Sequence, residues 1–189
     1  MNLALHLQQV RRFLILAAPL ALAAGLVACS HLAARTDLTH LPRHSAGRIA
    51  VRVEGDASRS MSASFDLRGD AQAGLLELGS PLGTQLAQAS WQGSRIELAT
   101  SDGLRRYASL DELSADAFGQ ALPMAALFDW LKARAWPGAP AAPLGGEGVG
   151  YLQLGWQVQL DRYADGLIVA RRNLPEPAIT VRVKLDPPS

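Results

Sequence analysis

Apolar and polar residues alternate one by one in segment after segment of this chain between residues 49 and 185. In the segment 49–53, for example, three aliphatic residues are separated by Ala50 and Arg52. A period of two is the spacing of a β-strand with one buried face and one face in solvent. The pattern recurs in the segments 61–67, 73–78, 85–91, 95–100, 104–108, 152–160, 167–171 and 179–185. Because each segment keeps one apolar and one polar face, we predict a single curved antiparallel sheet.

The longest alternation runs through 152–160, where leucines, Trp156 and Val158 alternate with glutamines and Gly155. We predict one continuous strand there, with Leu154 and Trp156 on its apolar face. The segment 136–150 before it is rich in Pro and Gly, and we predict a flexible loop inside the domain.

The middle of the chain changes to a helical period. Ser109 and Glu112 have the spacing of a capping box, which predicts a short helix to about Gln120. A second helix is expected from Pro123, with an apolar stripe formed by Met124, Leu127, Phe128 and Leu131. The stripe fits ordinary core packing, and it also fits a helix that lies over a lipid cavity. The fold class that follows is mainly β (α+β): an open half-barrel with short helices covering its concave apolar face.

The N-terminus has the pattern of an export signal. Two arginines precede an uncharged apolar stretch, 13–28, which is short for a membrane span and contains Pro19 and Gly25. A single transmembrane anchor is the alternative interpretation.

The next residue is Cys29, the single cysteine of the chain. The junction Leu26-Val27-Ala28-Cys29 resembles the bacterial lipobox, which implies lipid attachment at Cys29 and removal of residues 1–28. By the same resemblance, Ser30 in place of Asp implies export to the outer membrane. We therefore divide the chain into a signal peptide (1–28), a lipidated N-terminus and tether (29–46) and a folded domain (47–189).

The residue inventory argues against an enzyme. All four histidines precede residue 45 and no cysteine follows Cys29, which excludes a Ser-His-Asp triad, a Cys-His pair or a zincin motif in the folded body. The sequence GSPLG at 79–83 is not a nucleophile elbow. Asp111 and Glu112 are explained as charges at a helix N-terminus. A net charge of +1 gives no support for nucleic-acid binding. We predict no catalytic residue, no cofactor and no metal site.

Taken in order, the segments resemble the LolB family of outer-membrane lipoprotein receptors. The resemblance rests on Cys29 and on GRIAVRV, MSASFDLR, LLELGSPLGTQLAQ, LPMAALFDWLKARAWPG, LGWQVQLDRY and ITVRVKL. It implies a half-barrel whose cavity holds the acyl chains of lipoproteins. It also implies a periplasmic, LolA-like carrier as partner, and a monomeric receptor anchored in the outer membrane, facing the periplasm, that inserts its cargo into outer-membrane lipid.

The resemblance further assigns membrane insertion to a loop with an exposed leucine, which maps onto Leu82 between Pro81 and Gly83. The residues alone agree, because a Pro-Leu-Gly tip places a large aliphatic side chain in a tight turn.

Nine residues are predicted to line the cavity or the core, two roles that the sequence does not separate: Val51, Phe65, Leu78, Leu98, Leu127, Trp130, Leu154, Trp156 and Val181. The rival hypothesis is an outer-membrane lipoprotein that serves as an assembly module, with a filled core and no acyl-chain cavity.

Overall fold

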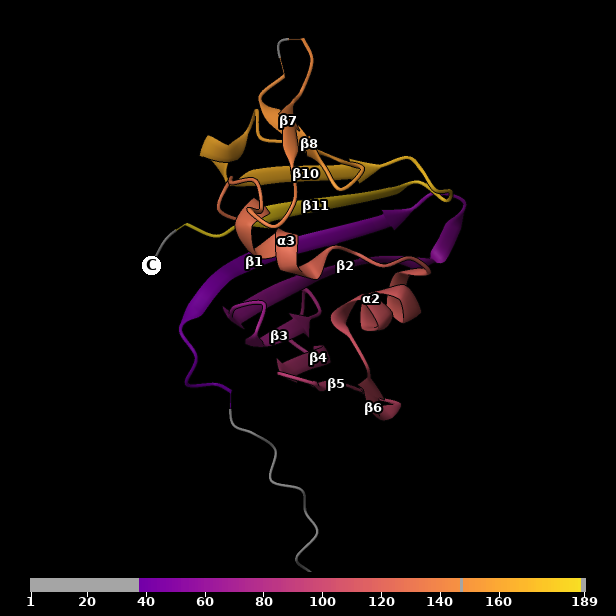
Figure 1. Ribbon diagram of the computed structural model, residues 1–189. Helices are drawn as coiled ribbons and strands as arrows, with labels where there is room; N and C mark the ends of the chain where they lie inside the picture. Colours follow the sequence, from indigo (N-terminus) through magenta and orange to yellow (C-terminus); the bar gives the residue numbers. More distant parts are fainter. Residues whose placement is uncertain (1–37, 147, 188–189) are drawn as a thin grey trace, which may run out of the picture. The chain divides into compact units, whose positions relative to one another are not determined.

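The computed structural model describes residues 38–146 and 148–187. From Leu38 onward the chain forms one compact unit, built on a single antiparallel sheet of 11 strands (Figure 1). The predicted signal peptide, Cys29 and the first part of the predicted tether lie outside the described residues.

The chain first makes a series of hairpins and then two helices, after which it returns to the sheet. The first strands are β1 (Arg43–Val53), β2 (Asp56–Gly69), β3 (Ala73–Gly79), β4 (Gln85–Gln92), β5 (Arg95–Thr100) and β6 (Gly103–Tyr107). The helices are α2 (Leu110–Phe118) and α3 (Met124–Trp130). The remaining elements are β7 (Ala141–Pro143), β8 (Gly150–Gln153), β9 (Trp156–Gln159), the 3-10 turn η1 (Tyr163–Asp165), β10 (Leu167–Arg172) and β11 (Ile179–Leu185).

The strand order explains why the helices cover the sheet. The order is β6-β5-β4-β3-β2-β1-β11-β10-β9-β8-β7, so that β6 and β7 are the two edges. The chain between these edges has to cross from one side of the sheet to the other, and α2 and α3 lie in this crossing segment. Figure 1 shows both helices lying across the sheet. The predicted open half-barrel, mainly β, is confirmed.

The alternation of the sequence becomes the two faces of the sheet. On β1, Val51 opposes Met61 of β2 and Val181 of β11. Val51 and Val181 are buried under the helices, whereas their neighbours Arg52 and Arg182 are exposed. The central strands β1 and β11 therefore contribute their apolar side chains to the concave face and their polar side chains to the convex face.

Local hydrogen bonds set the ends of α2. The Ser109 hydroxyl accepts from the Glu112 amide at 3.0 Å, as the predicted capping box requires. The Glu112 carboxylate accepts from the amide of Ala108 at 2.6 Å, one residue before the expected donor, Ser109. Gly119, with φ of 75°, ends the helix after Phe118.

The predicted single strand over 152–160 is wrong, because these residues form a hairpin. Gln153 pairs with Trp156, and the two-residue turn between them has positive φ at both Leu154 and Gly155. Gln153 therefore faces the core together with Trp156. Leu154 is 44% exposed at the turn, outside the buried core, and it does not line the apolar space between the sheet and the helices.

Two boundaries also differ from the prediction. The sheet begins at Arg43, inside the predicted tether, because residues 43–46 pair with β2. The predicted loop 136–150 contains β7, a three-residue edge strand that pairs with β8 and ends in Pro143.

Candidate functional site

An apolar cavity of about 310 Å³ lies between the concave face of the sheet and the two helices. Strands β1 to β5 and β11 supply its floor and walls, and α2, α3 and the residues that join them supply its cover. Apart from Ser58, Arg59, Ser60, Thr100 and Ser114, the lining side chains are Ala, Val, Leu, Ile, Met or Phe. Such a cavity accepts hydrocarbon and offers little to a polar ligand.

The structure separates the residues that the sequence could only group together. The predicted residues that line the cavity are Val51, Phe65, Leu78, Leu98, Leu127 and Val181. Trp130 and Trp156 are buried in the packed core beside it, with their rings 6.2 Å apart between centroids. Leu154 belongs to neither group.

A buried amide holds the end of α3, and sequence analysis missed it. Gln153 is only 2% exposed. Its Oε1 accepts from the Trp130 indole at 2.8 Å and from the Trp136 amide at 2.9 Å. Its Nε2 donates to the carbonyls of Trp136 and Ala139, at 2.7 and 2.8 Å. The alternation of the sequence predicts that this glutamine lies on the solvent face, so the pattern gave no sign that its side chain is buried.

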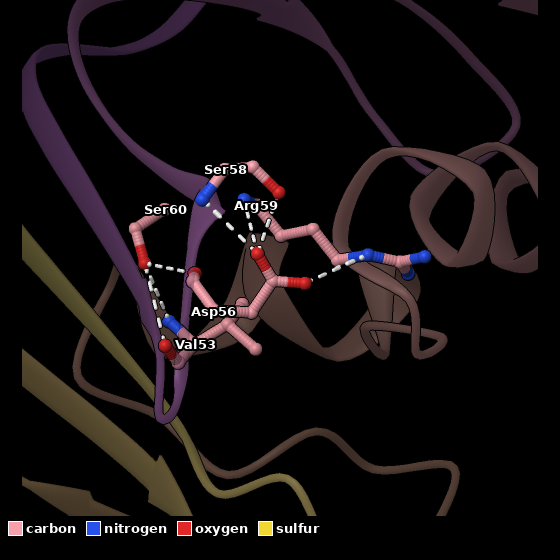
Figure 2. Close-up of polar contacts among 5 residues, drawn as sticks. All are labelled: Val53, Asp56, Ser58, Arg59 and Ser60. Atoms are coloured by element: carbon pink, nitrogen blue, oxygen red, sulfur yellow. Dashed lines mark hydrogen bonds and ion pairs between the residues drawn. The ribbon is translucent and has the colours of Figure 1, made fainter.

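One end of the cavity is bordered by the β1–β2 hairpin, shown in Figure 2. Asp56 accepts hydrogen bonds from the hydroxyl of Ser58 at 2.6 Å and from the amides of Ser58 and Arg59. The hydroxyl bond is the main reason that the pKa of the Asp56 carboxyl lies below its usual value. The guanidinium of Arg59 pairs with Asp56 at 3.2 Å.

Arg59 also connects this hairpin to α2. Its guanidinium packs so closely against Gly119 that a Cβ at position 119 would collide with it. It therefore lies at the C-terminal end of α2, where a positive charge is favourable. The contact restrains the helix at the border of the cavity.

Polar contacts fix the connection between α2 and α3. The Ser114 hydroxyl, which is buried, accepts from the Leu122 amide at 2.9 Å. The Gln120 amide nitrogen donates to the carbonyls of Pro175 and Pro177, at 3.3 and 2.8 Å. The cover of the cavity is thus attached to the loop between β10 and β11.

The loop between β3 and β4 presents the predicted leucine. Leu82 is 94% exposed, at the tip of a turn with Gly83 at φ of 82°. The Ser80 hydroxyl accepts from the amides of Leu82 and Thr84, and the Ser80 amide donates to the Thr84 carbonyl at 2.8 Å. Since the loop is braced by its own hydrogen bonds, the exposure of Leu82 is fixed by the backbone.

A second, more polar hollow lies beside α3, where His44 of β1 meets Phe128. The His44 ring packs edge-on against Phe128 at 5.0 Å, and its Nε2 lies 2.9 Å from the Phe128 carbonyl. Burial, and then the charge of Lys132, hold the pKa of His44 below its ordinary value of 6.5. Asp129 acts in the opposite direction and Arg134 in the same direction as Lys132.

Within the described ranges, no group of three His, Cys, Asp or Glu side chains is arranged to hold a metal ion. Among the helices of the same ranges, none is long and apolar enough to cross a membrane.

Comparison with known proteins identifies the family. The sequence matches the family model described as Outer membrane lipoprotein LolB over residues 44–186. The chain belongs to the LolB family.

Relatives with the same description confirm this membership. An outer-membrane lipoprotein LolB of Bordetella petrii is 32% identical over 184 residues, which cover 88% of this chain and 92% of the relative. The Bordetella pertussis protein of the same name is 34% identical, over 75% of this chain and 76% of its own. That of Ralstonia nicotianae is 45% identical over a shorter stretch, half of this chain and 46% of the relative. The LolB match therefore includes every strand, apart from the first residue of β1, and both helices that border the cavity.

Proposed function

We propose that this LolB-family chain is an outer-membrane-anchored receptor that accepts lipoproteins from a periplasmic, LolA-like carrier. It binds their acyl chains in the apolar cavity and inserts them into the outer membrane. The observation that carries the proposal is the cavity of about 310 Å³ with an almost wholly apolar lining. The transfer makes and breaks no covalent bond, so that it requires neither a catalytic residue nor a cofactor.

The size of the cavity sets what it holds in this conformation. A cavity of this volume corresponds to about ten water molecules, and a methylene group is of similar size. At about 0.8 kcal/mol for each buried methylene, ten of them stabilise a bound chain by about 8 kcal/mol, or a Kd of about 1 μM before the costs of association. A triacylated cargo carries several times as many methylene groups. Its binding therefore requires the cover to move away from the sheet.

The contacts of the cover identify what has to yield. The helices are joined to the sheet by packing, by the buried bond of Trp130 to Gln153 at the end of α3, and by surface contacts such as Arg59 at Gly119 and Gln120 at the β10–β11 loop. Tyr107 of β6 adds a hydrogen bond to Asp116 of α2 at 2.7 Å. The contacts of Arg59, Gln120 and Tyr107 are exposed, so water replaces them at low cost when α2 moves away from the sheet. The direction of transfer comes from affinity, which rises from carrier to receptor to membrane.

Lipid attachment at Cys29 keeps the receptor at the membrane, and the Leu82 loop brings the cavity to the bilayer. Burial of one leucine contributes about 1.5–3 kcal/mol, which is enough to orient an anchored domain and too little to anchor it.

The test is binding of a fluorescent triacylated lipopeptide to a soluble form that lacks residues 1–28 and carries Cys29→Ala. Monoacylated and non-acylated peptides serve as controls. Saturable binding near one ligand per protein, with preference for the triacylated peptide, is expected. No binding at micromolar concentration by a folded protein would reject the acyl-chain receptor and favour the assembly module.

A further inference from the structure

A second exposed leucine stands out on the loop between β10 and β11. Leu174 is 74% exposed, and among the described large apolar residues only Leu82 is more exposed. Its loop is held on both sides, by Gln120 at the carbonyls of Pro175 and Pro177 and by Arg171, whose Nε donates to the Asn173 side chain at 2.8 Å. As at Leu82, a braced backbone keeps an aliphatic side chain in solvent.

The register of the sheet places the two loops on the same rim. The base of the Leu82 loop, Gly79, aligns through Ser64 with Arg48 of β1. The base of the Leu174 loop, Arg172, aligns through Ile179 with Val53 of β1. The two bases are thus five residues apart along β1.

The positions of the two loop bases define the angle between the strands and the line that joins the loops. Five residues correspond to about 17 Å along the strands, and the four strand spacings between the loops to about 19 Å across them. The line that joins the loops makes an angle of about 50° with the strands. When strands tilt by about 35–45° from a barrel axis, the rim makes an angle of about 45–55° with them.

The opposite end of the sheet shows the same offset. There β2 ends beside Arg43, whereas β10 begins at Leu167, which aligns through Lys184 with Arg48. Both ends are therefore inclined in the same way, as expected for the two rims of one tilted half-barrel.

A cluster of positive charge lies at the base of the Leu174 loop. Arg52, Arg171 and Arg182 line a shallow hollow on the convex face, together with Glu54. All three arginines are exposed. The ion pairs of residues 38–146 and 148–187 involve none of them. An apolar tip beside basic side chains is the combination that binds the interface of a bilayer with anionic headgroups.

We propose that Leu174 is a second membrane-contact residue, and that Arg52, Arg171 and Arg182 bind lipid phosphates beside it. The proposal rests on the proposed function and extends it from one contact point to two. The loops are about 25 Å apart, and the β1–β2 hairpin between them is polar, with Glu54, Gly55 and Asp56. A protein partner usually needs a continuous interface of about 1,000 Å² or more, whereas a bilayer accepts separate apolar tips.

The test uses an environment-sensitive fluorophore on single cysteines. Leu174→Cys, Leu82→Cys and Val149→Cys are made in the soluble Cys29→Ala form, which contains the whole compact unit from Leu38 onward. Val149 is the matched control, because it is 59% exposed but precedes β8 at the opposite rim. With vesicles of phosphatidylethanolamine and phosphatidylglycerol, the labels at 174 and 82 should shift to the blue and be quenched by spin-labelled lipid, while the label at 149 stays unchanged.

Two further variants separate the apolar and the charged contributions. Leu174→Ser should weaken vesicle binding about tenfold or more. Replacement of the three arginines by glutamine should weaken binding to anionic vesicles and leave binding to phosphatidylcholine vesicles unchanged.

The possible failures are distinguishable. If the label at 82 responds to vesicles and the label at 174 does not, this inference is overturned and the proposed function stays intact. The same conclusion follows if the label at 174 responds to the periplasmic carrier but not to vesicles. If neither label changes its fluorescence with vesicles while lipopeptide binding is normal, membrane contact by this rim is rejected but the acyl-chain cavity is not.

Discussion

Ala87→Phe is the most direct test of the cavity. Ala87 lies on β4, opposite Leu78 and Thr100, and its half-buried methyl group lines the cavity. A phenyl ring at this position fills space equivalent to about six methylene groups, in a volume that holds about ten. If the ring displaces that many methylene groups of the cargo, up to about 5 kcal/mol of binding free energy is lost. Even half of this value lowers the affinity for acylated peptide by about 50-fold or more.

The same substitution should leave the protein folded, because the ring enters space that is unfilled. Overpacking of a filled core would cost about 1–3 kcal/mol. We therefore expect the free energy of unfolding of Ala87→Phe to lie within about 1 kcal/mol of the parent value. Ser62→Phe is the matched control, since Ser62 is exposed on the convex face and lies opposite Ala50 of β1. It adds the same ring outside the cavity.

The assay is titration of the fluorescent triacylated lipopeptide, with urea unfolding of each variant. The cavity hypothesis predicts weak binding by Ala87→Phe and normal binding by Ser62→Phe, at similar stability. Normal binding by a stable Ala87→Phe would refute the reasoning, because it would place the acyl chains elsewhere.

Gln153→Leu removes four hydrogen bonds and should lower the free energy of unfolding by about 4 kcal/mol, at about 1 kcal/mol for each bond. Gln157→Leu, on the exposed face of β9, should change it by less than about 0.5 kcal/mol; equal losses in urea unfolding would disprove the role of the buried amide. Leu82→Glu should bind lipopeptide normally and release it into liposomes about tenfold more slowly or worse, because it removes the proposed apolar contact with the bilayer. A normal release rate would end the assignment of this loop. Because the folded state lowers the pKa of His44, the unfolded chain binds its proton more readily. The contribution of His44 to stability is therefore complete above pH 6.5 and declines as the pH falls from there toward the folded pKa. His44→Gln should lose less stability over that range, and identical pH profiles of the two proteins would contradict this.

Much of the architecture could be predicted from local patterns. A period of two specifies which side chains share a face whatever the strand order is, and the exposure of Leu82 follows from its Pro-Leu-Gly turn. The capping box at Ser109 likewise depends on neighbours in the sequence. These features need no knowledge of distant contacts.

The prediction of secondary structure failed where the same alternation is compatible with either a continuous strand or a hairpin. From residue 152 to 160 the alternation continues unchanged through the Leu154-Gly155 turn, although the side chains exchange faces there. Gln153 is polar and buried because four groups satisfy it: the indole of Trp130 at the end of α3, and three backbone groups of Trp136 and Ala139. No local feature of the sequence indicates these partners.

The cavity itself could not be separated from the core by sequence. Val51 and Phe65 line empty space, whereas Trp156 is enclosed by packed atoms, yet all three are apolar residues on the concave face. The difference depends on how closely α2 and α3 approach the sheet, which is a property of the assembled fold.

The two edge strands have a consequence for the proposed anchoring of this protein at a membrane surface. An open sheet leaves unpaired amides and carbonyls at both edges, and anchored molecules collide often in two dimensions, so that edge-to-edge pairing between copies would lead to aggregation. Edge strand β7 is only three residues long, follows Pro140 and ends in Pro143, which has no amide hydrogen to donate. On β6, Arg105 pairs with Asp116 of α2 at 3.1 Å, and Arg106 pairs with Glu97 of β5 at 3.0 Å, which leaves a charged margin. The half-barrel can thus remain an open sheet while its edges resist joining those of neighbouring copies.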